Sequence, residues 1–525
     1  MSTASELVER LERELRPLVT AAESAWWDAA VDASPEHEAR RTETAIAVSD
    51  ALADPAAFAA LRAARADTGD GTDPSVARRV AVLHDWYAPN QVPAELRRAV
   101  VELQAAVESE FAQHRGEIAG RPVDDNEIAR ILRTSDDVEE RRGAWEASKT
   151  VGVAVADRLR ELARRRNAAA QELGWRDHFA LALDTNELDE DRLFATLDAV
   201  DAATAEPFRA WKAALDARLA ERFGIEVTEI APWHYDDPFF QAAPVPAAAD
   251  LDAVFADRDL EALTLRTYEG IGLDVAPVLT RSDLYPRAAK NQHAFCTDID
   301  REGDVRVLCN VTANERWMET MLHEFGHGTY FAEVDRDLPW TLRTMHALAT
   351  EGVAMLFGRL ARDPEWLRVV AGVDPDEVDR RATALDDARR AQLLVFARWV
   401  LVMTNFERGL YADPDGDHDA RWWELVERYQ LVRRPAGRRA PDWAAKIHLA
   451  VAPVYYQNYL YGEMVASQLE ATLRRDHGGI VDRPAAGRAL VEHVFRPGAA
   501  RRWDTLVTEA TGEPLTPAHL AAQLA

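Results

Sequence analysis

Lysine is almost absent from this chain of 525 residues. Four lysines occur, so arginine supplies nearly all of the positive charge, and 90 Asp+Glu against 62 Lys+Arg leave a formal net charge of −28. A chain this acidic lacks the positive field that nucleic acids and anionic membranes attract. We therefore expect no nucleic-acid partner and no membrane partner.

Cysteines and long apolar runs are scarce as well. Two cysteines in this length exclude a disulfide framework and are typical of a reducing compartment. No window approaches the roughly 18 uninterrupted apolar residues of a membrane-spanning helix. The first residues, MSTASELVERLERELRPLV, lack the apolar core of a signal peptide. These absences predict a cytoplasmic location.

Most of what is present has helical periodicity. Apolar residues recur every three or four positions through long Ala/Leu/Glu/Arg-rich segments, notably residues 5–112, residues 136–173 and the stretch after Asp189. No fixed-period repeat and no Gly/Ser linker separates these segments. The pattern predicts a mainly α protein with a single domain over residues 1–525, built either as one body or as two lobes.

One segment departs from the helical pattern. Residues 291–298 and 305–311 are short and apolar, and a turn-rich sequence joins them, which predicts a β-hairpin. If Glu302-Gly303 is the two-residue turn, Cys296 faces Cys309 across the hairpin. Two buried thiols and a cross-strand disulfide are both compatible with this register.

A metal-binding motif follows the hairpin. Thr312-Ala313-Asn314-Glu315 has the spacing of a capping box, so a helix is expected to begin there and to run through ERWMETMLHEFGHGTYFAE. His323 and His327 lie one turn apart on one helical face, where both imidazoles can bind one Zn²⁺. Glu324 is placed to take the proton of a metal-bound water.

A catalytic zinc site requires a third protein ligand and an open position. The next predicted helix, residues 342–360, offers His346 and Glu351. A carboxylate on an otherwise apolar helical face needs a partner, which a metal provides. We favour Glu351 as the third ligand and interpret His346 as a pocket or packing residue.

The motifs resemble the angiotensin-converting-enzyme family of zinc peptidases, with the thimet oligopeptidase family, which shares the string HEFGH, as a more distant relative. His293-Ala294 lies 30 residues before His323, as in the converting-enzyme pattern. A Lys-x-His motif near the C-terminus precedes two tyrosines spaced by three, as in that family. Looser likeness extends to Trp26-Trp27, TSDDVEERRGAWEA and APWHYDDPFFQ, so it covers nearly the whole chain.

This resemblance implies a role for each matching residue. Glu324 would act as general base, and His448 and Tyr459 as donors to the oxyanion. The backbone of Ala294, with His293, would align the peptide as an added strand. The remaining implied substrate-binding residues, which would read a free C-terminal carboxylate, are Gln241, Lys446 and Tyr456.

Three departures from the family pattern affect these roles. The gap from His448 to the tyrosine pair is intermediate between the two families, so Tyr455 is an alternative to Tyr456. The acidic residue expected four positions after the third ligand is Met355, which leaves the group that orients His327 open. The arginine that helps to bind chloride in animal members has no match, so chloride dependence is not inferred.

Three functions are compatible with the sequence. The favoured one is a peptidyl-dipeptidase with one Zn²⁺ per chain that removes dipeptides from the C-terminus of short peptides. The alternatives are a thimet-like oligopeptidase that cuts internally and a non-catalytic peptide-binding protein with a relic zinc site.

The resemblance further predicts an elongated helical body with a deep central cleft. Residues 1–112 would form a lid-like region, and residues 290–465 would hold the zinc site and cleft.

Overall fold

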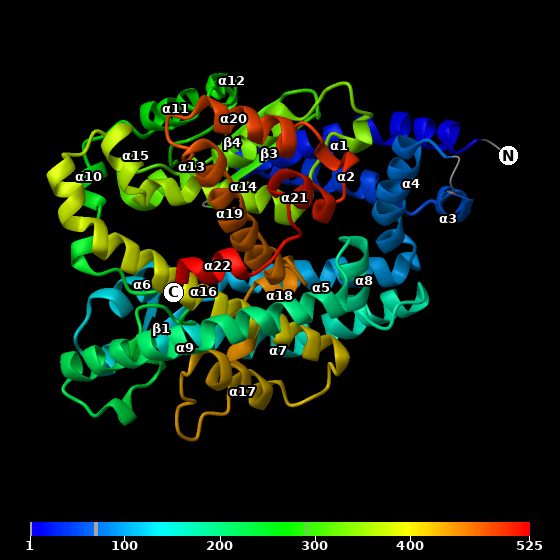
Figure 1. The fold of residues 1–525 in the computed structure, drawn as a ribbon. Coiled ribbons are helices and arrows are strands. Elements are labelled where there is room, and N and C mark those ends of the chain that lie inside the picture. Colours follow the sequence, from blue (N-terminus) through cyan, green and yellow to red (C-terminus); the bar gives the residue numbers. More distant parts are fainter. Residues whose placement is uncertain (1–2, 68–71, 288, 292, 525) are drawn as a thin grey trace. The chain divides into compact units, whose positions relative to one another are not determined.

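The fold is mainly α-helical, as predicted. The computed structural model describes residues 3–67, 72–287, 289–291 and 293–524, and within them it has 22 α-helices and two antiparallel sheets of two strands each (Figure 1). The chain divides into two compact units. Unit 1 comprises Met1–Gln91, Ala248–Thr383 and Tyr461–Leu520, and unit 2 comprises Val92–Ala247, Ala384–Leu460 and Ala521–Ala525.

Unit 1 contains the predicted zinc motif. Its elements are α1 (Ala4–Val31), α2 (Pro35–Leu52), α3 (Pro55–Asp67), α4 (Pro74–Tyr87), α10 (Asp252–Phe255), α11 (Leu260–Gly270), α12 (Ala276–Arg281), β3 (Phe295–Asp298), β4 (Val305–Leu308), α13 (Glu315–Glu333), α14 (Ala347–Gly358), α15 (Pro364–Val369), α20 (Pro484–Leu490) and α21 (Trp503–Thr511). Figure 1 shows α13 and α14 beside β3 and β4.

Unit 2 is organised around two long helices, α7 and α9. Its elements are α5 (Ala94–Gln113), β1 (Gly116–Ile118), β2 (Arg121–Val123), α6 (Asp125–Thr134), α7 (Val138–Glu172), α8 (His178–Thr185), α9 (Glu190–Phe223), α17 (His418–Gln430) and α18 (His448–Val451). Three further helices have residues in both units: α16 (Pro375–Ala412), α19 (Tyr456–His477) and α22 (Ala518–Leu524).

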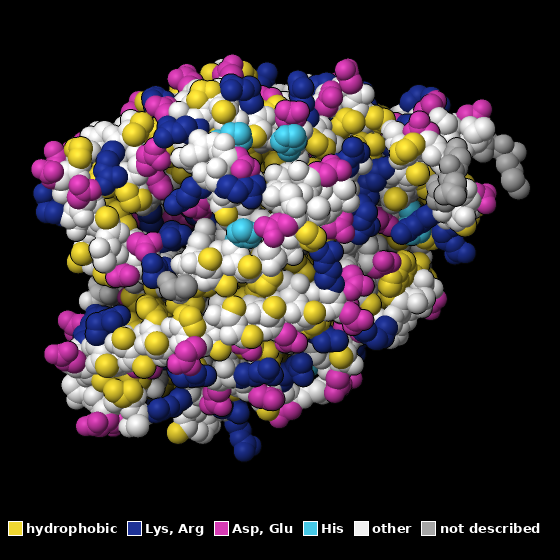
Figure 2. Space-filling view, in the orientation of Figure 1, with side chains coloured by type: hydrophobic (Ala, Val, Ile, Leu, Met, Phe, Trp, Pro, Cys, Tyr) yellow, Lys and Arg dark blue, Asp and Glu magenta, His cyan; other side chains and the backbone are white. Residues whose placement is uncertain are grey.

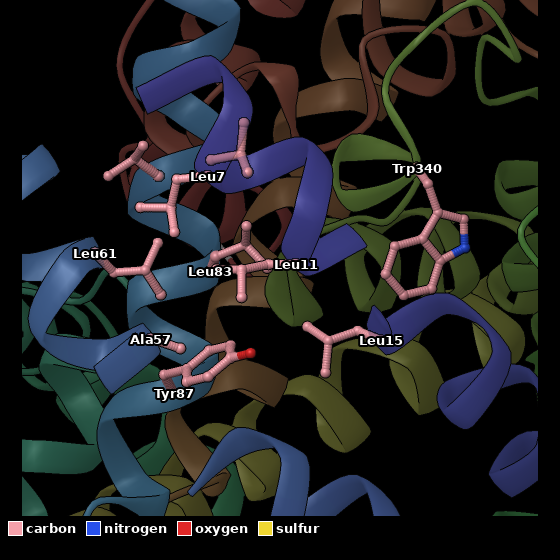
Figure 3. Packing of buried hydrophobic residues seen from close by; sticks show 10 residues of the cluster. Leu7, Leu11, Leu15, Ala57, Leu61, Leu83, Tyr87 and Trp340 are labelled. Carbon is pink, nitrogen blue, oxygen red and sulfur yellow. The ribbon is translucent and has the colours of Figure 1, made fainter. Parts of the chain in front are cut away.

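The first helices of unit 1 share a core with a loop near residue 340. Leu7, Leu11 and Leu15 follow the apolar stripe of α1 and pack against residues of α3 and α4 and against Trp340 (Figure 3). Thr3 caps α1, accepting a hydrogen bond from the backbone N–H of Glu6. The region predicted to be lid-like is thus divided, with residues 1–91 in unit 1 and the rest in unit 2.

The predicted hairpin exists, but its predicted register is wrong. Cys296 pairs with Val307, and not with Cys309, and both cysteines are free thiols. The Asp298 carboxylate accepts from the Arg301 N–H at 2.9 Å, and the Asp300 carboxylate accepts from two further N–H groups of the loop. These side chains stabilise a loop longer than the two-residue Glu302-Gly303 turn, which shifts the pairing by two residues.

β4 is the inner strand of this small sheet. The backbone of Asp283 exchanges hydrogen bonds with Val307 and Cys309, each of 2.9 Å, along the edge of β4 that faces away from β3. Among the described residues, no strand pairs with the outer edge of β3. That edge therefore has backbone groups suited to pairing with an extended peptide.

Side chains of α7 anchor the irregular segment before Gln241 in unit 2. The fully buried guanidinium of Arg141 donates to three successive carbonyls, those of residues 233–235, at 2.8–3.1 Å. Because a buried arginine needs acceptors for its donors, this arrangement fixes the segment against α7.

No single helix in the described part of the chain has the length and hydropathy to span a membrane, although α2 and α3, bent by 51°, meet these limits as a pair. Acidic and basic side chains are interspersed on the face shown in Figure 2.

Candidate active site

The HEFGH motif lies on α13, which ends at Glu333 as predicted. The helix begins at Glu315, and Asn314 is its N-cap, accepting from the Trp317 N–H at 2.9 Å. The predicted box that began at Thr312 is wrong by two residues, because the Asn314 side chain, and not that of Thr312, accepts from an N–H of the first turn.

The following helix is shorter than predicted. α14 begins at Ala347, and His346 has extended backbone angles and caps it by accepting from the Leu348 N–H at 3.3 Å. Its ring centroid lies 6.1 Å from that of Trp503. His346 therefore has a capping and packing role, in agreement with its interpretation as a packing residue.

Glycines let α13 and α14 approach closely. A Cβ on Gly326 would lie 2.9 Å from the Ala354 Cα, and a Cβ on Gly358 would lie 3.4 Å from the His323 Cβ. The second distance is an ordinary van der Waals contact, but the first is too short for a carbon–carbon contact, so any side chain at Gly326 would push the helices apart. This close packing places Glu351 of α14 opposite the histidines of α13.

A buried tyrosine fixes the turn before the first histidine. The Tyr268 hydroxyl donates to the Leu322 carbonyl at 2.7 Å, and its ring packs against Phe357 of α14 with centroids 4.7 Å apart. Tyr268 thus links α11 to both helices of the motif. Nothing in the sequence singles it out, because it lies about 50 residues before HEFGH without a motif of its own.

His323, His327 and Glu351 form a compact cluster. Their ligand atoms all lie within 4.8 Å of one another, and His323 Nε2 is 3.7 Å from a Glu351 carboxylate oxygen. The two imidazole rings are nearly perpendicular, with centroids 4.9 Å apart. Ligand atoms about 2.0–2.2 Å from one ion have such mutual distances, and two nitrogens with a carboxylate are a typical donor set for catalytic zinc. The cluster therefore fits Zn²⁺.

Burial keeps both histidines neutral. It lowers the pKa of His323 to about 4 and that of His327 well below its usual value, with His323 adding to the effect on His327. Neutral imidazoles are the form that binds a metal. Burial also raises the pKa of Glu324 to about 8, and the charge of Glu351 adds to this effect. A dication in the cluster would counteract it by stabilising both carboxylates.

Thr350 is a functional candidate that the sequence analysis missed. Its hydroxyl lies 2.6 Å from Nδ1 of His327. When Nδ1–H donates to the hydroxyl oxygen, the Nε2 lone pair is free to bind a metal, and holding the ring in this way is the usual role of an outer partner of a zinc histidine. Two features of the sequence could have identified Thr350. Its hydroxyl directly precedes the carboxylate ligand, and Met355 stands at the position where the family has an acidic residue.

His293 and Ala294 lie immediately before β3 and not within it. The His293 N–H donates to the Asn291 side chain at 2.9 Å, and the His293 side chain is exposed. Helix α1 supports the strand: the Thr297 hydroxyl donates to a Glu23 carboxylate oxygen at 3.0 Å. Residue 292, inside the predicted hairpin segment, lies outside the described residues.

The remaining predicted residues belong to unit 2. The Lys446 Nζ donates to the Gln241 Oε1 at 2.8 Å and lies 5.9 Å from the Tyr456 ring centroid. The Tyr456 ring lies 5.0 Å from His448 and 5.6 Å from Tyr459. The structure thus brings Lys446, Gln241, Tyr456, His448 and Tyr459 into one group.

Tyr455 and Tyr456 differ in environment. Tyr456 is buried and packs against Trp399, with ring centroids 5.8 Å apart, whereas Tyr455 is partly exposed beside Tyr459 at 5.1 Å. The contact of Lys446 with the Tyr456 ring favours Tyr456 over Tyr455 as part of the Lys446 group.

Comparisons with known proteins agree with the predicted resemblance. The family model "Angiotensin-converting enzyme" matches residues 1–227, and the model "Peptidase family M3" matches residues 279–525, which include the whole HEFGH cluster. The angiotensin-converting enzyme-related protein of Drosophila melanogaster is 20% identical over 240 residues, 42% of this chain and 38% of that relative. The chain thus matches well under half of the relative's length. The chain is thus similar to the angiotensin-converting enzymes over residues 1–227 and to the M3 peptidases over residues 279–525, both of which are zinc metallopeptidase families.

Proposed function

We propose that this protein is a zinc-dependent peptidase that releases dipeptides from the free C-terminus of short peptides. The observation that carries the hydrolytic part is the convergence of His323, His327 and Glu351 within 4.8 Å, with Glu324 adjacent to the first ligand. The dipeptidase part is supported by the Lys446–Gln241 pair, whose ammonium is suited to a carboxylate.

The protein's own residues account for the proton transfers and for substrate alignment. Zinc held by the cluster would lower the pKa of a water towards about 7 and polarise the scissile carbonyl. The Glu324 carboxylate takes the proton of the attacking water and delivers it to the leaving nitrogen. The outer edge of β3, with the backbone of Ala294 and with His293, aligns the substrate as an added strand.

His448 and Tyr459 complete the proposed mechanism as donors to the oxyanion. Their support is the sequence spacing and their common packing against Tyr456 in unit 2. Short or unfolded peptides are the proposed substrates, because an added strand requires an extended chain.

An oligopeptidase that cuts inside short peptides is the second candidate. It is favoured by the match of residues 279–525, which hold the zinc motif, to the M3 model. A non-catalytic binding protein is the third and weakest candidate. A relic site would be free to lose the general base, whereas this chain retains Glu324.

Mass spectrometry of cleavage products distinguishes these candidates. Peptides of one sequence are offered with a free and with an amidated C-terminus, before and after treatment with a chelator. We expect dipeptide release from the free acid alone, with activity lost on chelation and restored by Zn²⁺. Internal cleavage of both peptides would support the oligopeptidase, and no cleavage of either with zinc bound would support the binding protein.

A further inference from the structure

The loop of residues 237–241 in unit 2 is fixed by buried side chains. The Pro238 carbonyl accepts from the Lys149 Nζ at 2.8 Å and from the Trp145 indole N–H at 3.0 Å. The Gln430 side-chain amide donates to the next two carbonyls, at 3.0 and 2.7 Å. Because both α7 and α17 hold this backbone, the side chains that it carries are preorganised.

Asp237 sets the orientation of the Gln241 side chain. One Asp237 oxygen accepts from the backbone N–H groups of Phe239 and Gln241, at 2.9 and 3.0 Å. Its other oxygen accepts from the Gln241 Nε2 at 3.4 Å. An ionised carboxylate can only accept, so the amide turns its NH₂ to Asp237 and its oxygen to Lys446.

The side-chain NH₂ group of Gln241 therefore points to Asp237. The Gln241 Oε1 accepts from the Lys446 Nζ at 2.8 Å, which leaves further N–H donors of the ammonium available to a ligand. The rings of Phe239 and Trp399 lie 5.3 and 5.2 Å from the same Nζ and restrict where it can move.

We propose that Asp237 is a positioning residue of the carboxylate site. Through Gln241 it aims the Lys446 ammonium and keeps it charged, so that Lys446 itself contacts the C-terminal carboxylate of the substrate. This inference rests on the proposed reading of a free C-terminus and assigns Gln241 a supporting role.

The charges around Lys446 agree with this assignment. Burial lowers the pKa of Lys446 to about 8, and the negative charge of Asp237 acts in the opposite direction. Two further titratable groups that face Lys446 are Lys149 on α7, whose pKa burial lowers to about 7, and Tyr456, whose phenol pKa burial raises so that it stays neutral. Asp442, whose charge acts on Lys149, is paired with Arg438. Asp237 is thus the anionic member of the group.

The substitution Asp237→Asn tests this role with little change in shape. The amide oxygen can keep both backbone hydrogen bonds, but an NH₂ group then faces the NH₂ of Gln241. Two donors cannot bond to each other, so the Gln241 amide must turn, and Lys446 loses both its acceptor and the nearby negative charge. Loss of a nearby opposite charge lowers a lysine pKa by about one unit or more.

The measurement is binding to the full-length, zinc-loaded protein. An acetylated dipeptide acid and the matching dipeptide amide are titrated by calorimetry from pH 5.5 to 9.5. In the wild type, we expect the acid to bind more tightly than the amide, with the preference declining as the pH rises through about 8, since only the ammonium attracts the acid. In Asp237→Asn the midpoint of this decline should move down by about one pH unit or more, while amide binding stays unchanged.

Asp137→Asn is the matched control. Asp137 caps the first turn of α7 and accepts from two backbone N–H groups, at 2.9 and 3.1 Å, as Asp237 does in its loop. This variant should keep the wild-type pH profile. If Asp237→Asn does not fold, Gln241→Met serves instead, because it removes the link to Lys446 and leaves the Asp237 backbone bonds in place.

Two results would overturn the inference. One is an unchanged midpoint in folded Asp237→Asn or, where Gln241→Met replaces that variant, an undiminished preference for the acid over the amide below the midpoint. The other is equal binding of acid and amide by the wild type, which would remove the carboxylate site itself. A protein that shows the expected shift but hydrolyses no peptide would retain the inference and refute the proposed function, so the two failures are distinguishable.

Discussion

The Thr350 hydroxyl lies 2.6 Å from Nδ1 of His327 and takes the place of the acidic partner expected at position 355. A neutral hydroxyl orients the imidazole but adds no negative charge to it. The orientation of the His327 ring towards the cluster thus rests on a short hydrogen bond to Thr350, the residue directly before Glu351.

Removing that hydroxyl should weaken zinc binding without unfolding the protein. Thr350→Val keeps the shape and loses the bond, and outer partners of zinc histidines typically contribute 10–100-fold in metal affinity. Competition with a fluorescent chelator measures the change. Thr350→Ser is the control and should remain close to the wild type; equal losses in both variants would contradict an orienting role.

The roles of Glu351 and Glu324 should separate in a pair of identical substitutions. Glu351→Gln removes an anionic ligand, so the zinc content measured by mass spectrometry should fall sharply. Glu324→Gln should keep zinc and fold but lose activity, because an amide cannot take the proton of water; general-base catalysis contributes about 10²–10⁴-fold. Full zinc content in the first variant, or near-normal kcat in the second, would be incompatible with these assignments.

The contact between α13 and α14 predicts a cost for enlarging Gly326. In Gly326→Ala the new Cβ lies 2.9 Å from the Ala354 Cα, so the helices must separate and Glu351 moves with α14. Overpacking of this kind lowers the free energy of unfolding by about 1–3 kcal/mol, and zinc affinity should fall with it.

Gly143→Ala on α7 is the control for this substitution. The nearest heavy atom to its new Cβ is the end of the Ile118 side chain at 3.3 Å, which can move. Chemical denaturation and zinc titration of both variants check the prediction, and equal stability of the two would show that the helix contact is not tight.

The zinc motif could be predicted from the sequence because it depends on local spacing. His323 and His327 are one turn apart on any helix, and Glu351 is recognisable as an isolated carboxylate on an otherwise apolar helical face. The sequence could not predict the register of the hairpin or the caps of α13 and α14. Several neighbouring side chains can accept from the same backbone N–H groups, and which of them does so depends on the conformation of the folded loop.

Contacts between distant segments were beyond the sequence for a different reason. Tyr268 acts through a tertiary hydrogen bond to the Leu322 carbonyl and belongs to no motif with fixed spacing. Asp237 contacts Gln241 only four residues along the chain, but side chains of α7 and α17 hold the loop that brings the two together. Thr350 is intermediate: its position beside Glu351 is visible, but its bond to His327 requires the crossing of two helices.

Tyr459→Phe tests the proposed oxyanion donor. The hydroxyl is expected to act on the transition state, so kcat should fall with little change in KM. One lost donor of this kind typically costs about 3–4 kcal/mol of transition-state stabilisation. Steady-state kinetics on one peptide checks this, with Tyr455→Phe as the control on the adjacent ring. If Tyr456→Phe shows the kcat loss and Tyr459→Phe does not, the roles of the two tyrosines are exchanged.

Lys446 decides between the two peptidase functions. A charge-assisted bond to a carboxylate in a partly dehydrated site contributes about 1.5–3 kcal/mol, or roughly 10- to 150-fold in affinity. Lys446→Ala should therefore raise KM for free-acid peptides by that factor and leave KM for amidated peptides nearly unchanged.

Burial lowers the pKa of Lys446 to about 8, so the wild-type preference for free acids is present below that pH and is lost as the pH rises through it. Lys446→Arg retains its charge over this range and should lose the alkaline decline while it binds the carboxylate in altered geometry. Kinetics with both peptides from pH 6 to 9.5 measures all three effects. Equal cleavage of acid and amide by the wild type would mean that no carboxylate is read, and internal cleavage by an M3-like oligopeptidase would then be the better description.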